Sequence, residues 1–467
     1  MQKYQYQKTS LRTSSFTSMK HLAVVLALFI CIPSATSAQV DSAQLVATYR
    51  EIALRIIAAS MKDSLAYERL AELCDTFGPR LSGSENLERA IDWCLAKMKA
   101  DGFDKVQGEP VMVPRWVRGK ETCQLISPRA HNIAVLGLGG SIPTPKNGIT
   151  AEVLVVRDFD ELDARASEAK GKIVLFNTPF TQYGQTVRVR VLGAQRAAKV
   201  GAVASLIRSV GPFSLYTPHT GGMAYADSIP KIPHAAISLE DAEMLARMQK
   251  RGQKVVVKLV LESKQLPDSP SRNVIAEIRG SEKPDEIVVF GGHIDSWDVG
   301  QGAMDDAGGC IAAWHALKVI QSLGLRARRT LRVVLWTNEE NGFRGATAYA
   351  EAHKHEKHVL AIESDAGVFK PTGFGFTGKD SVLQIIKAIS GLLTPIDAAR
   401  ITLGGGGADI APLMQQGVPG LGLQVDGSRY FWYHHTHADT VDKLNPEELN
   451  RCVAAMAIMA FVAADLP

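Results

Sequence analysis

The chain has 467 residues, of which 46% are hydrophobic and 21% are charged, and its formal net charge at pH 7 is +4. This length favours two domains over a single core, and the composition is that of a globular protein in water. The small net charge, without a cluster of Lys and Arg interleaved with aromatic residues, excludes nucleic acid as an expected partner.

The first 38 residues have the pattern of a secretory signal peptide. Basic residues precede an apolar run over residues 22–33, and small residues follow as far as Ala38. Because the apolar run is too short to span a bilayer stably, we expect removal of residues 1–38, a secreted or periplasmic protein, and no stable membrane insertion afterwards. The alternatives are a short membrane anchor and a lipoprotein modified at Cys31, which the bulky Ile30 before it disfavours.

Five cysteines follow the expected signal peptide: Cys74, Cys94, Cys123, Cys310 and Cys452. Their odd number and irregular spacing do not indicate a disulfide framework, so at most two bridges are expected. No CxxC pair is present, and zinc bound through cysteine is therefore unsupported.

The segment that follows is predicted to be helical and then extended. Apolar residues at three- and four-residue spacing predict helices over residues 44–77 and 84–99, and alternation predicts strands over 106–113 and 133–138. The Gly- and Pro-containing run 139–145 is the best boundary signal in the chain. We therefore expect residues 39–145 to form the first part of a catalytic domain.

Residues 146–266 carry a self-contained pattern. Strands are expected at 151–156, 172–176, 203–207, 235–238 and 255–261, with a helix at 187–200. A second boundary is expected at residues 265–270, which contain two prolines. This pattern predicts that 146–266 is an inserted domain, and that residues 39–145 and 267–467 pack together as one discontinuous domain.

From Asn273 onwards, strands and helices alternate. Apolar strands are expected at 287–290, 331–337 and 359–362, and helices at 306–322, 342–352 and from residue 446. Nearly continuous apolar strands separated by helices predict an α/β fold, with a mostly parallel or mixed sheet and helices on both faces. In such sheets, sites form beyond the carboxyl ends of the strands.

Groups able to bind a metal follow each of these strands. They are His293, Asp295, Asp305, Asp306, Glu339, Glu340 and Asp365, with His434, His435 and His437 after the apolar run 421–425. Imidazole and carboxylate ligands without thiolates suit a catalytic zinc with an open coordination position. Two cations about 3.5–4 Å apart need a shared anionic ligand, and an adjacent carboxylate can serve as general base.

Several of these assignments have alternatives. An Asp at a helix start is commonly a cap, so we expect Asp306 to cap and Asp305 to bind metal. Glu339 and Glu340 could instead form a solvated helix start. His435 competes with its neighbours for the role of ligand.

A second group of histidines is less suited to bind metal. His353, His355 and His358 lie in a polar run, and no HExxH sequence is present. We expect this group to be a solvated helix end.

Five sequence blocks resemble a known family. They are residues 291–298 (GGHIDSWD), 302–306 (GAMDD), 335–340 (LWTNEE), 363–367 (ESDAG) and 435–440 (HTHADT). In this order and spacing they make the chain resemble the M28 family of co-catalytic zinc exopeptidases, and within it the plasma glutamate carboxypeptidase group, over nearly the whole mature length. The inserted region is similar to a protease-associated domain, chiefly at residues 171–175 and 194–204.

The resemblance implies two zinc ions per chain bridged by Asp305. The ligands of one zinc would be His293, Asp305 and Asp365, and those of the other would be Asp305, Glu340 and His435. Glu339 would be the general base that activates the bridging water. Asp295 would orient His293 by accepting its other ring N–H.

The chain departs from the family at one position. Many relatives have a Tyr directly before the last His ligand, where its hydroxyl can stabilise the oxyanion. Here His434 occupies that position and Tyr433 lies one residue earlier. The resemblance therefore assigns no oxyanion donor.

The implied function is hydrolysis of terminal peptide bonds of short peptides or dipeptides, with the terminus left open and a homodimer as a possible assembly. One alternative is a catalytically inactive, peptidase-like binding or receptor protein. Another is a single-zinc aminoacyltransferase like glutaminyl cyclase. Because every ligand position of the family is filled, the resemblance favours the dinuclear peptidase over both.

Overall fold

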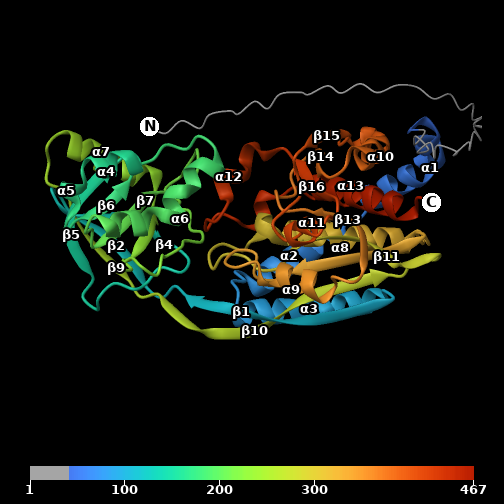
Figure 1. Cartoon of the computed structure of the whole chain (residues 1–467), viewed down its shortest axis with the longest axis horizontal. Coiled ribbons are helices and arrows are strands. Elements are labelled where there is room, and N and C mark those ends of the chain that lie inside the picture. The colour runs from blue at the N-terminus through green and yellow to red at the C-terminus, as the bar shows by residue number, and fades with distance from the viewer. Residues whose placement is uncertain (1–41) are drawn as a thin grey trace, which may run out of the picture. The chain divides into compact units, whose positions relative to one another are not determined.

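The computed structural model describes residues 42–467, so the expected signal peptide lies outside the described residues. The described chain folds into two eight-stranded sheets with helices packed against them (Figure 1). Its five cysteines are buried free thiols. None of the helices within 42–467 combines the length and the apolar character that crossing a membrane requires.

The amino-terminal segment forms three helices: α1 (Ser42–Met61), α2 (Leu65–Phe77) and α3 (Glu85–Asp101). The single helix expected over 44–77 is thus divided in two. The carboxylate of Asp63 accepts a hydrogen bond from the main-chain N–H of Leu65 at 2.8 Å, which satisfies a free donor where α2 begins. Ser84 caps α3 in the same way, through the N–H of Leu87 at 3.2 Å.

The first sheet has the strand order β1-β10-β12-β11-β13-β16-β14-β15. Its strands are β1 (Lys105–Val117), β10 (Lys264–Ile278), β11 (Lys283–His293), β12 (Arg329–Trp336), β13 (Lys357–Glu363), β14 (Pro371–Thr377), β15 (Arg400–Leu403) and β16 (Gly420–Val425). Strand β11 pairs in parallel with β12 and β13, and β13 pairs in parallel with β16. The outer pairs β1–β10, β10–β12 and β14–β16 are antiparallel, which confirms the predicted α/β fold with a mixed sheet.

Helices cover both faces of this sheet. On β11, Val288 and Phe290 belong to a core shared with α8 (Gly308–Ser322) and α13 (Pro446–Asp465). The alternate residues Ile287 and Val289 belong to the opposite core, with α9 (Arg344–Ala352) and α11 (Ala411–Gln415). Residues 287–290 of β11 are buried on both faces, and this part of the strand is therefore continuously apolar.

Strand β10 was not expected, because residues 265–270 contain Pro267 and Pro270. Over this stretch β10 pairs with β1, and its pairing with β12 begins only at Val274. A proline can be accommodated there because one edge of the strand is free and its missing N–H is not needed. The expected boundary is therefore part of a long two-stranded ribbon.

The second sheet has the strand order β3-β2-β9-β5-β6-β7-β8-β4. Its strands are β2 (Glu121–Ser127), β3 (His131–Ile133), β4 (Val135–Gly137), β5 (Ile149–Val156), β6 (Ile173–Phe176), β7 (Ala204–Arg208), β8 (His234–Ile237) and β9 (Val256–Leu261). Two of its helices are α6 (Tyr183–Lys199) and α7 (Leu239–Lys250). Because β2, β3 and β4 precede residue 145 and still belong to this sheet, we propose that the inserted domain spans residues 121–261.

Candidate metal centre

The predicted ligands meet at the carboxyl ends of three adjacent parallel strands. His293 is the last residue of β11, Glu340 follows the end of β12, and Asp365 follows the end of β13. Asp305 precedes α8, and His435 follows the short helix α12 (Tyr430–Tyr433). The rule that sites form beyond the carboxyl ends of strands thus places all five groups together.

The carboxylate of Asp305 lies between two histidines. Its Oδ1 is 3.2 Å from Nε2 of His293, and its Oδ2 is 3.3 Å from Nε2 of His435. Each histidine also faces a second carboxylate: Asp365 Oδ1 is 3.3 Å from His293 Nε2, and Glu340 Oε2 is 3.2 Å from His435 Nε2. The arrangement is two ligand sets that share Asp305.

These separations fit zinc. Ligand atoms about 2.0–2.1 Å from a tetrahedral zinc lie roughly 3.3 Å from one another. His293 Nε2 and Glu340 Oε1 are buried and make no hydrogen bond of normal geometry, so both atoms have unused capacity to bind a cation. The site therefore fits two zinc ions held by imidazoles and carboxylates.

Proximity alone would group these ligands differently, as Asp305 with His434 and His435, and as His293 with Asp306 and Asp365. However, Asp306 already accepts two main-chain hydrogen bonds, from His293 at 3.0 Å and from Gly309 at 3.1 Å. These bonds cap α8 and join it to β11. We therefore assign Asp306 a structural role and keep Asp305 as the ligand.

His434 packs against His435 with their rings nearly parallel and 3.5 Å between centroids. Its Nε2 is 3.7 Å from Asp305 Oδ2, farther than that of His435. Burial, with the neighbouring His435, holds the pKa of His434 well below its usual range. His437 is exposed, so His435 is the best placed of the three histidines.

Asp295 is placed differently from the expectation. His293 Nδ1 is 3.0 Å from the main-chain oxygen of Asp295 and 3.7 Å from its carboxylate, so the ring N–H donates to the main chain. The Asp295 carboxylate instead accepts hydrogen bonds from the main-chain N–H groups of Glu339 at 3.0 Å and Glu340 at 3.3 Å. Asp295 thereby fixes the turn that carries both glutamates.

Glu339 lies close to the predicted ligands but is not one of the three carboxylates, Asp305, Asp365 and Glu340, that face a histidine Nε2. Burial raises the pKa of its carboxyl well above the usual range, and the charges of Asp365 and Glu340 add to this rise while His293 opposes it. Crowded carboxylates of this kind are stabilised in the ionised form by bound cations. A carboxylate in this position is suited to general-base chemistry.

The proposed inserted domain (residues 121–261, called the inserted segment below) contributes directly to the site through Thr220. The carbonyl oxygen of Thr220 is 3.3 Å from Nδ1 of His435, and its main-chain N–H donates to the His435 carbonyl at 3.0 Å. When Nδ1–H donates to a carbonyl, Nε2 is left free for a metal. The sequence did not indicate Thr220, because a residue of any type can make these main-chain contacts.

Arg190 and Tyr183 of α6 also reach the site. Arg190 is only 7% exposed; its Nη1 donates to the Thr220 carbonyl at 3.4 Å and its Nη2 to the Tyr183 hydroxyl at 2.9 Å. Its Nη1 also lies 3.4 Å from His435 Nδ1, and none of these partners is anionic. The sequence could have indicated Arg190, because this arginine lies on the buried face of a helix, between Thr186 and Gly193.

A cavity of about 280 Å³ opens beside Asp365, one of the predicted metal ligands. Its lining includes Asp365 and His434 from the first sheet's loops, Tyr430 from α12, and Tyr183 from the inserted segment. The cavity is therefore bounded by a predicted ligand on one side and by aromatic rings on the other. Its position and size suit part of a short peptide.

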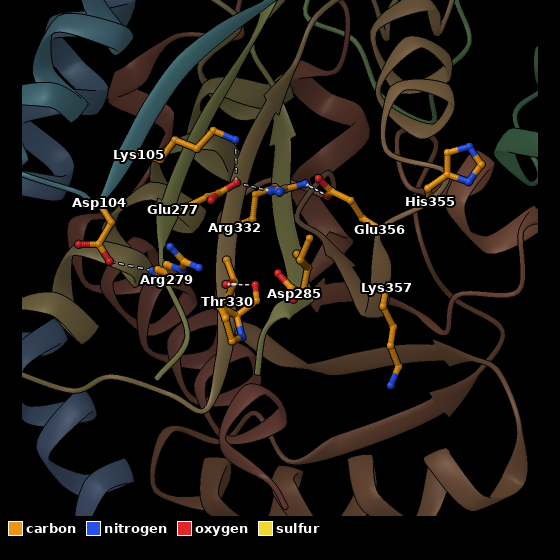
Figure 2. A pocket seen from close by; sticks show the side chains of 12 residues that line it. Asp104, Lys105, Glu277, Arg279, Asp285, Thr330, Arg332, His355, Glu356 and Lys357 are labelled. Carbon is orange, nitrogen blue, oxygen red and sulfur yellow. Dashed lines mark hydrogen bonds and ion pairs between the residues drawn. The ribbon is translucent and has the colours of Figure 1, made fainter. Parts of the chain in front are cut away.

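A second cavity, of about 630 Å³, lies at the opposite end of the sheet (Figure 2). It is lined by the beginnings of β11, β12 and β13, and its acidic and basic side chains largely neutralise one another. Figure 2 shows Arg332 between Glu277 and Glu356, with hydrogen bonds to both. No predicted metal ligand lines this cavity, so it is separate from the candidate metal centre.

The histidines near this second cavity differ from the expectation of a solvated helix end. His355 is exposed, but His353 is only 8% exposed. His353 Nε2 is 2.9 Å from Glu109, and its Nδ1 is 3.1 Å from Glu356. The polar sequence was misleading because the carboxylate of Glu109 on β1, far away in the chain, pairs with this ring.

The chain is similar in sequence and in structure to known peptidases. Residues 273–460 match the profile of peptidase family M28. The chain is 50% identical to mouse (Mus musculus) carboxypeptidase Q over 426 residues, which cover 90% of this chain and 91% of the relative. The crystal structure of a peptidase M28 precursor from Shewanella amazonensis SB2B superimposes with a TM-score of 0.87 at 39% identity, covering 90% of this chain and 97% of that one. A zinc aminopeptidase from Bacillus subtilis, 20% identical with a TM-score of 0.65 over 86% of this chain and 95% of its own, shares the fold.

Proposed function

Because the chain belongs to peptidase family M28 and is a zinc metallo-exopeptidase of that family, we propose that it uses two zinc ions to hydrolyse terminal peptide bonds of short peptides, including dipeptides. The observation that carries the proposal is the placement of Asp305, whose two oxygens face His293 and His435 separately. A carboxylate in this position offsets the repulsion between two cations.

His293, Asp305 and Asp365 would hold one zinc ion, and Asp305, Glu340 and His435 the other. When bound, the zinc ions polarise the scissile carbonyl and lower the pKa of the attacking water. Glu339 takes the proton of that water and passes it to the leaving amine. Asp295 positions Glu339 by binding its main-chain N–H, and Thr220 positions His435 by accepting from its ring.

The amino-terminal pattern of residues 1–38 supports export, so the proposed enzyme acts in the periplasm or outside the cell. The carboxypeptidase name of the mouse relative favours removal of the carboxy-terminal residue. Two peptide series, one blocked at the amino terminus and one at the carboxyl terminus, test this choice. Hydrolysis of only the carboxyl-blocked series would instead make the protein an aminopeptidase.

The proposed function is tested with a panel of unblocked dipeptides. We expect the purified protein to release free amino acids, to lose this activity on chelation, and to recover it when zinc is restored. A zinc-loaded protein that hydrolyses none of the dipeptides or short peptides would overturn the proposal.

A further inference from the structure

Tyr183 is held rigidly at the edge of the cavity beside the metal ligands. It is the first residue of α6 in the inserted segment. Its ring stacks on Phe431, with centroids 5.1 Å apart and planes at 27°, and meets His434 edge-on at 5.3 Å and 89°. Tyr183 lines the same cavity as Asp365, so it borders the space that a peptide bound at the metal centre would use.

The Tyr183 hydroxyl is polarised by a buried cation. Arg190 Nη2 donates to its oxygen at 2.9 Å, and this bond uses a lone pair of the phenol and leaves the O–H hydrogen available. Among residues 42–467 the Arg190 guanidinium contacts no carboxylate; its other hydrogen bond is to the Thr220 carbonyl, which also accepts from His435 Nδ1. A hydroxyl that accepts a hydrogen bond from a cation becomes a stronger donor.

The hydroxyl is also within the electrostatic field of the metal-binding carboxylates. Burial raises the pKa of Tyr183; Arg190 opposes this rise, while the charges of Asp305 and Glu340 add to it. Burial, the largest of these effects, favours the neutral phenol, which keeps its hydrogen and can donate it. A protonated, immobilised donor of this kind is what a developing oxyanion requires.

We propose that Tyr183 is a catalytic residue, which donates its hydroxyl hydrogen to the oxygen of the scissile carbonyl as negative charge develops there. This inference rests on the proposed peptidase function. Many relatives have a Tyr directly before the last His ligand, where its hydroxyl can stabilise the oxyanion, and this chain has His434 there. Tyr183 would supply the missing hydroxyl. The oxyanion donor comes from the inserted segment, so that segment completes the active site.

The test compares Tyr183→Phe with the wild-type protein in three measurements. Removing one preorganised oxyanion donor typically lowers kcat by about 10²–10³, and we expect a loss of that size for dipeptides with little change in KM. The affinity for a phosphinic dipeptide analogue, whose tetrahedral centre imitates the attacked carbonyl, should fall by a similar factor in calorimetry. The zinc content should not change.

The matched control is Tyr216→Phe, which removes the hydroxyl of an exposed tyrosine in the same segment, bonded to the Asn132 carbonyl. We expect Tyr216→Phe to retain wild-type kcat and analogue affinity. The calorimetric comparison remains valid if Tyr183→Phe is less stable, because it is made on the folded, zinc-loaded fraction.

Three results would overturn the assignment of Tyr183 while leaving the peptidase function intact. The first is an unchanged kcat in Tyr183→Phe while Glu339→Gln is inactive. The second is an increase in KM confined to peptides with a free carboxyl group, which would make Tyr183 a reader of the substrate terminus. The third is a loss of kcat and analogue affinity in Tyr430→Phe instead. A wild-type protein without peptidase activity would overturn both proposals.

Discussion

The carbonyl oxygen of Thr220 lies 3.3 Å from Nδ1 of His435, so a main-chain group of the inserted segment orients a predicted metal ligand of the first sheet. The two residues are 215 positions apart in the chain, and a second hydrogen bond, from Thr220 N–H to the His435 carbonyl, holds them in register. Because His435 has a positive φ of 61°, its backbone depends on such contacts. The inserted segment therefore supports the metal centre as well as bounding the cavity.

Gly221 offers a way to disturb this contact. Its φ is +136°, and a Cβ there would overlap the guanidinium of Arg190. We expect Gly221→Ala to displace Arg190 and Thr220 and to weaken zinc binding by about 10–100-fold, the usual effect of losing a group that orients a ligand. Competition with a chromogenic chelator measures this affinity.

Gly222→Ala is the control for that substitution. A Cβ at Gly222 would lie 3.5 Å from the Glu340 carbonyl oxygen, an ordinary contact. We expect zinc affinity close to that of the wild type. Equal losses in both variants would contradict the specific role of the Thr220–His435 contact.

Glu339→Gln tests the general base. The amide has the size of the carboxylate but cannot take a proton from water, and we expect kcat to fall by about 10²–10⁴. Because Glu339 is not among the proposed ligands, elemental analysis should still find two zinc ions per chain. Retained activity, or loss of zinc together with activity, would contradict the assigned role.

Asp305→Asn tests the bridge. An uncharged amide cannot offset the repulsion between two cations, so we expect the variant to hold fewer than two zinc ions and to lose activity. Asp285→Asn, at an exposed carboxylate on the opposite end of β11, is the matched control and should keep both ions. Two tightly bound zinc ions in Asp305→Asn would show that another group bridges them.

The buried His353 predicts a pH dependence of stability. Burial alone would lower its pKa, but its hydrogen bonds to Glu109 and Glu356 outweigh that effect and raise the pKa to about 9. The raised pKa means that its contribution is fully present below about pH 6.5 and is lost as the pH rises through about 9. A shift from 6.5 to about 9 corresponds to roughly 3–4 kcal/mol.

Urea unfolding of His353→Gln and wild type at pH 6 and pH 10 checks this prediction. The difference in unfolding free energy should be large at pH 6 and smaller at pH 10. His355→Gln, which changes an exposed histidine nearby, should unfold like the wild type at both pH values. A difference for His353→Gln that does not depend on pH would contradict the proposed charge on this ring.

The strands of the first sheet, and the meeting of polar groups at their ends, could be predicted because both depend on local sequence. The division of those groups into two ligand sets comes from the family resemblance and stays a prediction. Continuous apolar runs identified β11, β12 and β13, and the polar groups directly after them had to meet at one edge of a parallel sheet. Choosing Asp305 over Asp306 followed from the ordinary role of an Asp at a helix start. The structure supports that choice through the main-chain bonds of Asp306.

Other features depend on contacts between distant segments. Thr220 acts through its main chain, and Arg190 and Tyr183 matter because α6 packs against the loop that carries His435. Strand β10 contains prolines that only an unpaired strand edge permits. None of these contacts follows from residue type or periodicity.

Anomalous diffraction at the zinc edge from crystals of the zinc-loaded protein shows directly whether Asp305 bridges two zinc ions. We expect two peaks about 3.5–4 Å apart, one beside His293 and Asp365 and the other beside Glu340 and His435, with an oxygen of Asp305 on each. A single peak, or two peaks that do not share Asp305, would contradict this bridging role.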